Sequence, residues 1–427
     1  MNSKIALIFY YKRENRYSYN ALAGAMEKDS EVRKINVYFL SNEKEIFNEI
    51  PIILKNHEKI IFGISFSTPQ FWEIKDLVEK SKKIFSNKTI FLAGGPHPTG
   101  DPYRTLQIGF DLVIRGEGEE AFLELLNKII NDENYFEIKG VSYLDKNREY
   151  VFTGNRGLLD INNYHPISKF YSKYGPIEIT RGCPFACSYC QTSHIFGKKP
   201  RHRNIDNILD CVSMMKERNL NDFRVITPNA FSYGSEDGKN INYEKLESLL
   251  SSVRNLLGKE GRIFFGSFPS EVRPEHVDFD TVNIVKKYAD NDNLVIGAQS
   301  GSQKILDFIR RGHDIQSIYK AVELTRQAGL KANVDFIFGL PSETDDDISL
   351  TLKVIKDLNK LGARIHAHTF MPLPQTPLKK EKGGKISPAL RKEINRLCSN
   401  GILYGDWQKQ EKIAAKISTK LKIENEI

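Results

Sequence analysis

The chain has 427 residues, which is long for a single hydrophobic core and predicts two or three domains. Its 62 basic and 54 acidic residues leave a net charge of +8, a modest excess that favours anionic cofactors or partners and does not by itself indicate a nucleic-acid-binding protein. No apolar run approaches the roughly 20 residues that a membrane-spanning helix needs, so no membrane span is expected.

The first ten residues, Met1–Tyr10, are soon followed by charged residues and predict a first strand rather than a signal peptide. The five cysteines offer no disulfide framework. Because free thiols are typical of a reducing compartment, we expect a cytoplasmic protein.

Apolar runs that predict strands alternate with segments whose apolar residues recur near every 3.6 positions in the first third of the chain. The expected strands are Ile5–Phe9, Asn36–Leu40, Ile60–Ser65, Thr89–Ala93 and Asp111–Ile114. The expected helices are Glu43–Lys55, Gln70–Ser86 and Glu119–Asn131. This alternation predicts an α/β domain over residues 1–135 with a flavodoxin-like (Rossmann-like) parallel sheet. Residues 136–172, with a hairpin-like stretch at Val141–Phe152, are expected to form a linker.

Two loops of the first domain are rich in small residues at the ends of expected strands. Gly94, Gly95 and His97 follow the fourth strand, and Gly116 and Gly118 follow the fifth. Ligands of such sheets bind outside the carboxyl ends of the strands, so these residues are candidates for cofactor binding. His97 precedes a proline and either contacts the cofactor or completes a turn.

Strand–helix alternation resumes near residue 173 and predicts a partial (β/α)6 barrel over residues 173–380. The expected strands are Ile177–Thr180, Phe223–Thr227, Arg262–Gly266, Leu294–Ala298, Lys331–Phe338 and Arg364–Phe370. A short helical extension is expected over residues 381–427.

Three cysteines, Cys183, Cys187 and Cys190, follow the first barrel strand with the spacing CxxxCxxC. Thiolates are the usual ligands of iron–sulfur clusters, and a four-iron cluster normally takes four of them. Three close ligands predict one open iron that binds a small molecule, just as a three-ligand zinc site does. A zinc site with His194 or His202 as fourth ligand is the alternative, but zinc motifs usually pair CxxC with a second distant pair.

The CxxxCxxC pattern, with the aromatic Tyr189 directly before the third cysteine, resembles the signature of the radical S-adenosylmethionine (radical SAM) enzymes. The resemblance implies a [4Fe-4S] cluster whose open iron is chelated by S-adenosylmethionine, which is cleaved by electron transfer to give a 5′-deoxyadenosyl radical. It also implies a reducing electron donor such as ferredoxin or flavodoxin.

Loops after the later barrel strands resemble the cofactor-binding blocks of the same family. The residues that the resemblance assigns to the cofactor are Pro228 and Asn229 after the second strand, Ser270 and Arg273 after the third, Gln299, Ser300 and Arg311 after the fourth, and Gly339 after the fifth. Two positions depart from the family pattern, because Ser342 and Gln375 stand where glycine is common.

Residues 1–135 resemble the cobalamin (B12)-binding-like domain that precedes many radical SAM barrels, through the two glycine loops and the strand between them. The resemblance implies cobalamin as a further cofactor. The best-known version of that domain carries Asp-x-His-x-x-Gly after its first strand, whereas Tyr10–Arg16 contains no histidine. This removes the expected lower ligand of cobalt, and it leaves open that the domain is a substrate cap or docking surface without cobalamin.

The leading hypothesis is a cobalamin-dependent C-methylase or a related carbon-radical transformation acting on a small-molecule, lipid or peptide substrate. The alternatives are a cobalamin-free radical SAM oxidation, cyclisation or carbon–carbon coupling enzyme, and a non-catalytic iron–sulfur electron-transfer or sensor protein. Methylthiolation of tRNA is not favoured, since it needs a second cluster and only Cys211 and Cys398 remain. With no terminal basic module either, no nucleic acid partner is expected.

His366 and His368 alternate along the sixth expected barrel strand, so their side chains point the same way. They are candidates for an acid, a base, metal ligands or substrate contacts, and the alternative is a pair of satisfied core histidines.

Overall fold

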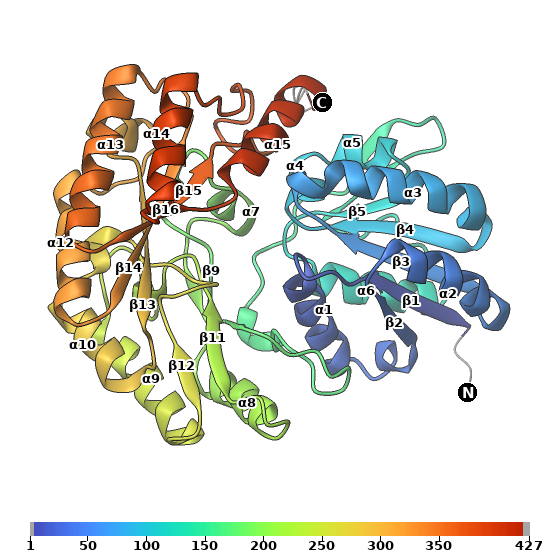
Figure 1. Cartoon of the computed structure of the whole chain (residues 1–427). Coiled ribbons are helices and arrows are strands. Elements are labelled where there is room, and N and C mark those ends of the chain that lie inside the picture. The colour runs from blue at the N-terminus through green and yellow to red at the C-terminus, as the bar shows by residue number, and fades with distance from the viewer. Residues whose placement is uncertain (1–3, 422–427) are drawn as a thin grey trace. The chain divides into compact units, whose positions relative to one another are not determined.

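The computed structural model describes residues 4–421 and divides into two compact units, residues 1–175 and 176–427. Each unit combines a parallel sheet with helices (Figure 1). Among the described residues, none of the helices is long and apolar enough to cross a membrane.

The first unit is built on a seven-stranded sheet with the order β2-β1-β3-β4-β5-β6-β7. The first five strands are parallel, and β6 and β7 are antiparallel additions. They are β1 (Ile5–Tyr10), β2 (Asn36–Leu40), β3 (Lys59–Ser65), β4 (Thr89–Gly94), β5 (Leu112–Ile114), β6 (Val141–Leu144) and β7 (Tyr150–Phe152). The 2-1-3-4-5 order of the parallel strands is the flavodoxin-like order, as predicted.

Residues 136–172 differ from the predicted linker. The hairpin forms, but β6 pairs with β5 through Val113–Ser142 and Ile114–Val141 and so extends the sheet of the first unit. Val141 is fully buried in the hydrophobic core of this unit. The apolar residues of the hairpin therefore belong to the first unit's core, and the boundary between the units falls at Gly175.

The helices of the first unit explain why its strands read as continuous apolar runs. They are α1 (Arg16–Lys28), α2 (Glu43–Asn56), α3 (Phe71–Phe85), α4 (Pro96–Gly100), α5 (Pro102–Gln107) and α6 (Glu119–Ile130). All six residues of β1 are buried, because helices cover the sheet (Figure 1). Phe9 of β1 packs against Tyr19 of α1 and Phe122 of α6 in the core.

The second unit contains the expected partial barrel of six parallel strands. The six strands are β8 (Ile177–Glu178), β11 (Asp222–Ile226), β12 (Arg262–Phe264), β13 (Asn293–Gln299), β14 (Lys331–Phe338) and β15 (Arg364–Thr369), and the short β16 (Leu403–Tyr404) adds a seventh at the edge, next to β15. They form the runs β12-β11-β8 and β13-β14-β15-β16. The amide of Val295 donates to the carbonyl of Gly266 at 2.9 Å, which joins the two runs just beyond β12.

A helix follows nearly every barrel strand. They are α7 (Thr192–Phe196), α8 (Ile205–Lys216), α9 (Tyr243–Leu257), α10 (Phe279–Tyr288), α11 (Gln303–Phe308), α12 (Ile315–Gln327), α13 (Asp345–Lys360), α14 (Pro388–Ser399) and α15 (Trp407–Lys420). Several of the longer ones begin at a residue whose side chain caps the first turn, such as Asn204 for α8 and Thr344 for α13.

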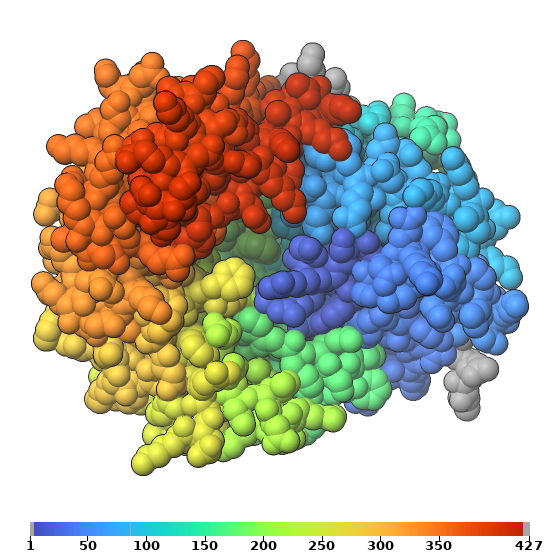
Figure 2. All heavy atoms as spheres, in the orientation of Figure 1, coloured from blue at the N-terminus to red at the C-terminus, as the bar shows by residue number. Residues whose placement is uncertain are grey.

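The segment predicted as a C-terminal extension is integrated into the second unit. Beyond residue 380, the amide of Gly384 donates to the carbonyl of Phe370 at 2.9 Å. Strand β16 then pairs with β15 of the barrel. Figure 2 shows the red C-terminal residues lying against the orange surface of the same unit. The reason is the apolar face of α14 and α15, where Leu397 and Ile417 are buried.

Candidate functional site

The three-cysteine loop is held by backbone contacts at the carboxyl edge of the barrel. It follows β9 (Thr180–Arg181) and leads into α7. The amide of Cys183 donates to Gly197, and the amide of Ser188 donates to the carbonyl of Ile309 at 2.9 Å. Gly182 has φ +89, and a Cβ there would lie 2.4 Å from the Lys199 carbonyl oxygen. Only glycine fits this turn without displacing the backbone.

The thiols of the loop lie in a setting that disfavours bare thiolates. Burial raises the pKa of Cys183 and of Cys190, and mutual repulsion with the neighbouring thiolates adds to both shifts. Cys187 is 5% exposed. Three thiols on one loop, of which Cys187 is buried and the other two are partly exposed, therefore need a cation to be deprotonated together, which is the role a metal centre fulfils.

The spread of the thiols suits a cluster better than a single zinc ion. Among the described residues, the one group of three ligands whose atoms lie within 4.8 Å of one another is Asp335, His366 and His368, so the cysteines are not such a group. A single tetrahedral ion would need closer convergence. A four-iron cluster takes each thiolate on a different iron, and its donor set is the one present here.

Arg311 is the buried cation of this site. Its Nη1 lies 3.7 Å from the Sγ of Cys187, and its Nη2 and Nε donate to the carbonyl of Gly297 at 2.6 and 3.2 Å. Burial alone would lower the pKa of Arg311, but Tyr189, Cys187 and Glu271 raise it above its ordinary value. The guanidinium therefore stays charged beside the cluster loop.

Three polar side chains come close together at Gly297. A Cβ on Gly297 would lie 2.6 Å from Nη2 of Arg311, 2.9 Å from Nε2 of Gln299 and 3.0 Å from Oε2 of Glu271. Gln299 adopts φ +77 at a register shift in β13, which turns its side chain away from the regular strand alternation. The side chains of Arg311 and Gln299, which were both predicted to bind the cofactor, therefore lie close together. The Glu271 side chain lies at the same point and was not predicted from the sequence.

Arg273 and His313 form the second layer of polar groups around Arg311. Arg273 is buried, donates to Glu275 and to the Arg311 carbonyl, and stacks on Phe185 at 3.4 Å from the ring centroid. The His313 ring is buried with no hydrogen-bond partner for Nε2. Burial, with the two arginines, lowers the pKa of His313 to about 2.

Other predicted residues support the fold around this centre. Asn229, preceded by Pro228, accepts from the amide of Arg273 at 3.1 Å. Ser270 donates to the carbonyl of Ser267 at 3.1 Å. The hydroxyl of Ser300 accepts from the amide of Ser302, and a Cβ on Gly339 would meet Gly384 at 2.8 Å. Their contacts with a cofactor stay predictions, and the hydrogen bonds of Asn229, Ser270 and Ser300 show that these three residues also stabilise the loops around them.

The glycine loops of the first unit leave unfilled space at the carboxyl ends of β4 and β5. A Cβ on Gly94 or on Gly116 would meet nothing within 4 Å, and one on Gly118 would make ordinary contact with Leu22 at 3.6 Å. Gly95, at φ +93, is instead needed for its turn, where a Cβ would lie 2.7 Å from Ser65 Oγ. A bulky planar cofactor fits over such bare backbone.

His97 lies beneath this surface. Its ring is fully buried, stacks on Phe66 with centroids 5.3 Å apart, and its Nδ1 lies 3.0 Å from Thr68 Oγ1. Burial lowers its pKa to about 3, so it is neutral. The loop after β1 has no histidine, and Asn15 there donates to the Ser65 carbonyl at 2.6 Å. A direct contact of His97 with a cofactor stays a prediction, and its burial favours a structural role.

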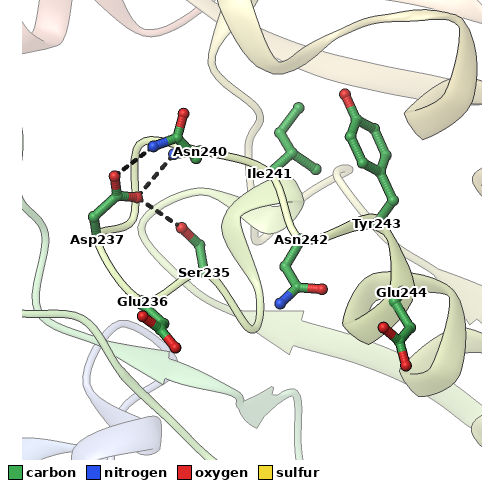
Figure 3. Close-up of a pocket in the computed structure, with 8 residues that line it drawn as sticks. All are labelled: Ser235, Glu236, Asp237, Asn240, Ile241, Asn242, Tyr243 and Glu244. Carbon is green, nitrogen blue, oxygen red and sulfur yellow. Dashed lines mark hydrogen bonds between the residues drawn. The ribbon is translucent and has the colours of Figure 1, made fainter.

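A pocket of about 500 Å³ lies beside the loop after β11. Figure 3 shows its lining from Ser235 to Glu244, with the Asp237 carboxylate turned back onto its own loop. That carboxylate accepts from Ser235 and from the amides of Lys239 and Asn240. Its acceptors are therefore already used by the loop, and the pocket lining contains none of the three cysteines.

Comparison with protein families matches both units. A model of the radical SAM superfamily matches residues 177–355, and a model of the B12 binding domain matches residues 18–126.

Two relatives extend over most of the chain. An uncharacterized protein of Methanocaldococcus jannaschii is 27% identical over 414 residues, which cover 92% of this chain and 84% of that protein. A protein of Pyrococcus horikoshii, named an uncharacterized methyltransferase, is 27% identical over 349 residues, covering 78% of this chain and 71% of that protein.

Two solved structures share the fold. The radical S-adenosylmethionine methyltransferase TsrM from Kitasatospora setae, with cobalamin and a [4Fe-4S] cluster bound, has a TM-score of 0.69 at 15% identity over 89% of this chain and 74% of that chain. The cobalamin-dependent S-adenosylmethionine radical enzyme OxsB has a TM-score of 0.63 at 15% identity, covering 82% of this chain and 51% of that chain. The chain therefore carries a radical SAM domain preceded by a B12-binding domain, and these domains imply an enzyme with a [4Fe-4S] cluster, S-adenosylmethionine and cobalamin.

Proposed function

We propose that this protein is a cobalamin-dependent radical SAM C-methylase or an enzyme of a closely related carbon-radical transformation. One observation carries the proposal: a single chain combines an open three-thiol loop on a barrel with a B12-binding unit whose glycine loops leave room at Gly94 and Gly116. The name of the Pyrococcus horikoshii relative and the fold shared with TsrM agree with this function.

The residues of the barrel divide the task of holding the cofactors. When bound, the cluster and S-adenosylmethionine supply a 5′-deoxyadenosyl radical that removes hydrogen from a substrate carbon, and cobalamin supplies the methyl group. Cys183, Cys187 and Cys190 hold the cluster. Arg311, charged and buried beside Cys187, is placed to bind a carboxylate through its planar fork. Gln299 offers an amide at the same point.

The test uses anaerobically purified and reconstituted enzyme. We expect an absorption spectrum that contains bound cobalamin, and formation of 5′-deoxyadenosine from S-adenosylmethionine after reduction. Labelled S-adenosylmethionine with a trideuterated methyl group, supplied together with a low-molecular-mass cell extract, should yield a product that carries the label on carbon. Absence of cobalamin binding would exclude the methylase and leave a radical enzyme, whereas an intact cluster that never cleaves S-adenosylmethionine would exclude both.

A second candidate is a cobalamin-free radical SAM enzyme that performs oxidation, cyclisation or carbon–carbon coupling. It is favoured by the absence of a histidine between Tyr10 and Arg16 and by the burial of His97, which leave no exposed histidine on these loops for cobalt. Formation of 5′-deoxyadenosine without any transfer of the labelled methyl group is the outcome that selects this candidate.

We further propose a one-electron donor of the ferredoxin or flavodoxin type as the physiological partner, because the cluster must be reduced before S-adenosylmethionine is cleaved. Methylthiolation of tRNA, the activity in the names of some shorter matches, is not proposed here. Apart from the three-cysteine loop, the chain has Cys211, a buried residue of α8, and Cys398, a residue of α14. Two thiols on separate helices cannot provide the three ligands that a second cluster of this kind would need.

A further inference from the structure

A compact polar cluster lies on one face of the barrel sheet, opposite the residues that pack under the helices. Asp335 of β14 is directly opposite His366 of β15, and His366 Nδ1 lies 3.1 Å from Asp335 Oδ1. His368 follows on the same face, with its ring centroid 4.2 Å from that of His366. The flanking Val334, Phe336, Ile365 and Ala367 are fully buried on the other face.

The polar cluster of Asp335, His366 and His368 lies inside the barrel, as the candidate cofactor site does. Asp335 is paired on its other side with Gly297 of β13, whose carbonyl holds Arg311. Asp335 also raises the pKa of Glu271, although burial is the larger cause of that shift. Cys187, Arg311, Gly297, Asp335 and His366 therefore follow one another in a single contiguous row.

The hydrogen bond to Asp335 determines which nitrogen of His366 carries a proton. An ionised carboxylate only accepts hydrogen bonds, so Nδ1 of His366 must be the N–H. In the neutral ring the lone pair is then on Nε2. This arrangement leaves Nε2 of His366 as the proton acceptor and fixes the orientation of the ring, as a carboxylate orients a catalytic imidazole. The His366 side chain is 32% exposed, so the ring is partly accessible.

Gln410 of α15 determines the opposite tautomer for His368. Its Oε1 accepts from the amide of Thr369 at 2.8 Å, which fixes the orientation of the side-chain amide. Its Nε2 therefore donates to Nδ1 of His368, 3.2 Å away. Burial lowers the pKa of His368, so the ring is neutral and its proton is on Nε2. His368 is a hydrogen-bond donor next to an acceptor.

The other charged or titratable groups around the pair leave this assignment intact. Tyr404 of β16 stacks on His366 with centroids 4.8 Å apart, and burial, with Asp335, raises the pKa of Tyr404, so it remains neutral. Arg364 contacts the Tyr404 ring, with its guanidinium carbon 4.9 Å from the ring centroid. Asp335 is the anion in contact with the pair.

We propose that His366, positioned by Asp335, is a general base that accepts a proton from the substrate, and that His368 donates a hydrogen bond beside it. This inference rests on the proposed radical enzyme and deepens it, because it names the substrate class: a molecule that presents an ionisable O–H or N–H group near the reacting carbon. An unfunctionalised hydrocarbon chain has no group to engage the pair.

The proton transfer is balanced within the site. The substrate O–H or N–H bond breaks, its electron pair stays on the oxygen or nitrogen, and a new N–H bond forms at Nε2 of His366. The resulting imidazolium is paired with the Asp335 carboxylate. Asp335 is thus a positioning residue, and His366 is the catalytic one.

A divalent metal ion is the competing occupant, because Asp335, His366 and His368 each offer a ligand atom within 4.8 Å. A metal needs a lone pair from each ring. The Nδ1 lone pair of His368 accepts from Gln410 and its Nε2 carries the proton, so binding would require the Gln410–Thr369 contact to break. The hydrogen-bond pattern therefore favours proton transfer over a metal.

The test is carbethoxylation of histidines by diethylpyrocarbonate, a reagent that is attacked by the neutral imidazole lone pair. Cluster-loaded enzyme is treated between pH 5.5 and 8, and each histidine is followed by peptide mass spectrometry, with the partly exposed His165 as internal reference. We expect His366 to react at least about tenfold faster than His368. Asp335→Asn, which keeps the size of the side chain, should lower the His366 rate about tenfold, because the ring loses the carboxylate that holds the proton on Nδ1 and leaves the lone pair on Nε2.

Gln410→Leu is the matched control for the neighbouring ring. It should release Nδ1 of His368 and raise the reactivity of that ring, while His366 keeps its rate. An unchanged His366 rate in Asp335→Asn would overturn the proposal. So would binding of one Zn²⁺ per chain that protects both histidines and is lost in Asp335→Asn. Neither readout needs cobalamin or S-adenosylmethionine cleavage, so failure here is distinguishable from failure of the proposed methylase.

Discussion

Nη1 of Arg311 lies 3.7 Å from the sulfur of Cys187, although the two residues are 124 positions apart in the chain. The contact is made possible by the short helix α11, after which the amide of Arg311 donates to the carbonyl of Leu306 at 2.8 Å. A buried cation beside Cys187 would offset the negative charge of thiolates that hold a cluster, and it keeps a fixed fork of N–H donors at this loop. This pair links the barrel's fourth strand to the loop after its first.

Replacing Arg311 with glutamine should therefore reduce the rate of 5′-deoxyadenosine formation by about 10²-fold, which is the usual effect of removing one preorganised donor from a site of charge development. Arg311→Lys should recover only part of the rate, because it keeps the charge without the planar fork. Arg262→Gln breaks the exposed pair with Asp222 and is the control expected to keep the wild-type rate. A wild-type rate in Arg311→Gln would remove this residue from the site.

The three-cysteine loop predicts that the cysteine variants will differ clearly in iron content. Alanine at Cys183, Cys187 or Cys190 should each abolish the four-iron absorption of the reconstituted enzyme, because every thiolate holds a different iron. Cys211→Ala should retain full iron and sulfide, since Cys211 is a fully buried core residue of α8. His194→Ala should also retain iron. Loss of metal in His194→Ala, with zinc in the wild-type protein, would instead support a Cys3His zinc site.

A substitution at Gly182 tests whether cluster binding depends on the shape of the loop as well as on its three cysteines. Gly182→Ala places a methyl group 2.4 Å from the Lys199 carbonyl oxygen at φ +89, so the loop must shift although all three cysteines remain. We expect iron content after reconstitution to fall by more than half. Gly401→Ala is the matched control, because Gly401 has φ +70 with nothing within 4 Å of its Cβ position. Equal iron loss in both variants would show that backbone strain alone is responsible.

Much of the fold could be predicted because the apolar runs are local and long. All five parallel strands of the first unit and the six strands of the barrel were expected close to their observed bounds. Helix α1 was missed, since its buried face consists largely of small or polar residues such as Asn20, Ala23 and Gly24. The Val141–Phe152 hairpin was recognised but not its pairing with β5, because strand partners are set by tertiary packing and not by the strand's own sequence.

The site could be predicted only where its residues share a loop. The three thiols lie on one short loop. Gln299 and Arg311 lie in a segment of the sequence that resembles a cofactor-binding motif of the radical SAM enzymes. Glu271 was missed because nothing in its sequence neighbourhood shows that its carboxylate interacts with both Arg311 and Arg273. The Asp335–His366 pair likewise depends on the register of β14 against β15, which a single sequence does not reveal.

The open space at Gly94 predicts a selective loss of cobalamin. Gly94→Leu should fold normally, because its backbone is not in the left-handed region and its Cβ meets nothing within 4 Å. The added side chain should weaken cobalamin binding at least about tenfold by filling the space over the backbone, while iron content stays unchanged. Gly157→Leu is the control, since Gly157 is equally open in the same unit. Unchanged cobalamin affinity in Gly94→Leu would remove this loop from the cofactor site.

Glu343 predicts a pH dependence of stability. Its Oε2 accepts from the amide of Gly339 at 3.0 Å, its Oε1 is buried without a hydrogen-bond partner, and burial raises its pKa from 4.5 to about 7. In the unfolded chain this carboxyl ionises near its ordinary pKa, whereas the folded protein keeps the proton until about pH 7. The folded state binds more protons between these values, so this residue's contribution to stability decreases as pH rises through that window and stays reduced above it.

Glu343→Gln keeps an acceptor for Gly339 but cannot ionise. We therefore expect the variant to be more stable than wild type at pH 8, on the order of 1–3 kcal/mol from the size of the pKa shift, and the difference to vanish towards pH 5. Anaerobic thermal melting of the cluster-loaded protein at pH 5, 6.5 and 8 measures this difference, with Glu381→Gln at an exposed position of the same unit as control. A difference that is constant across the three pH values would mean that Glu343 is already ionised in the folded protein, because only a proton retained on folding couples the two equilibria.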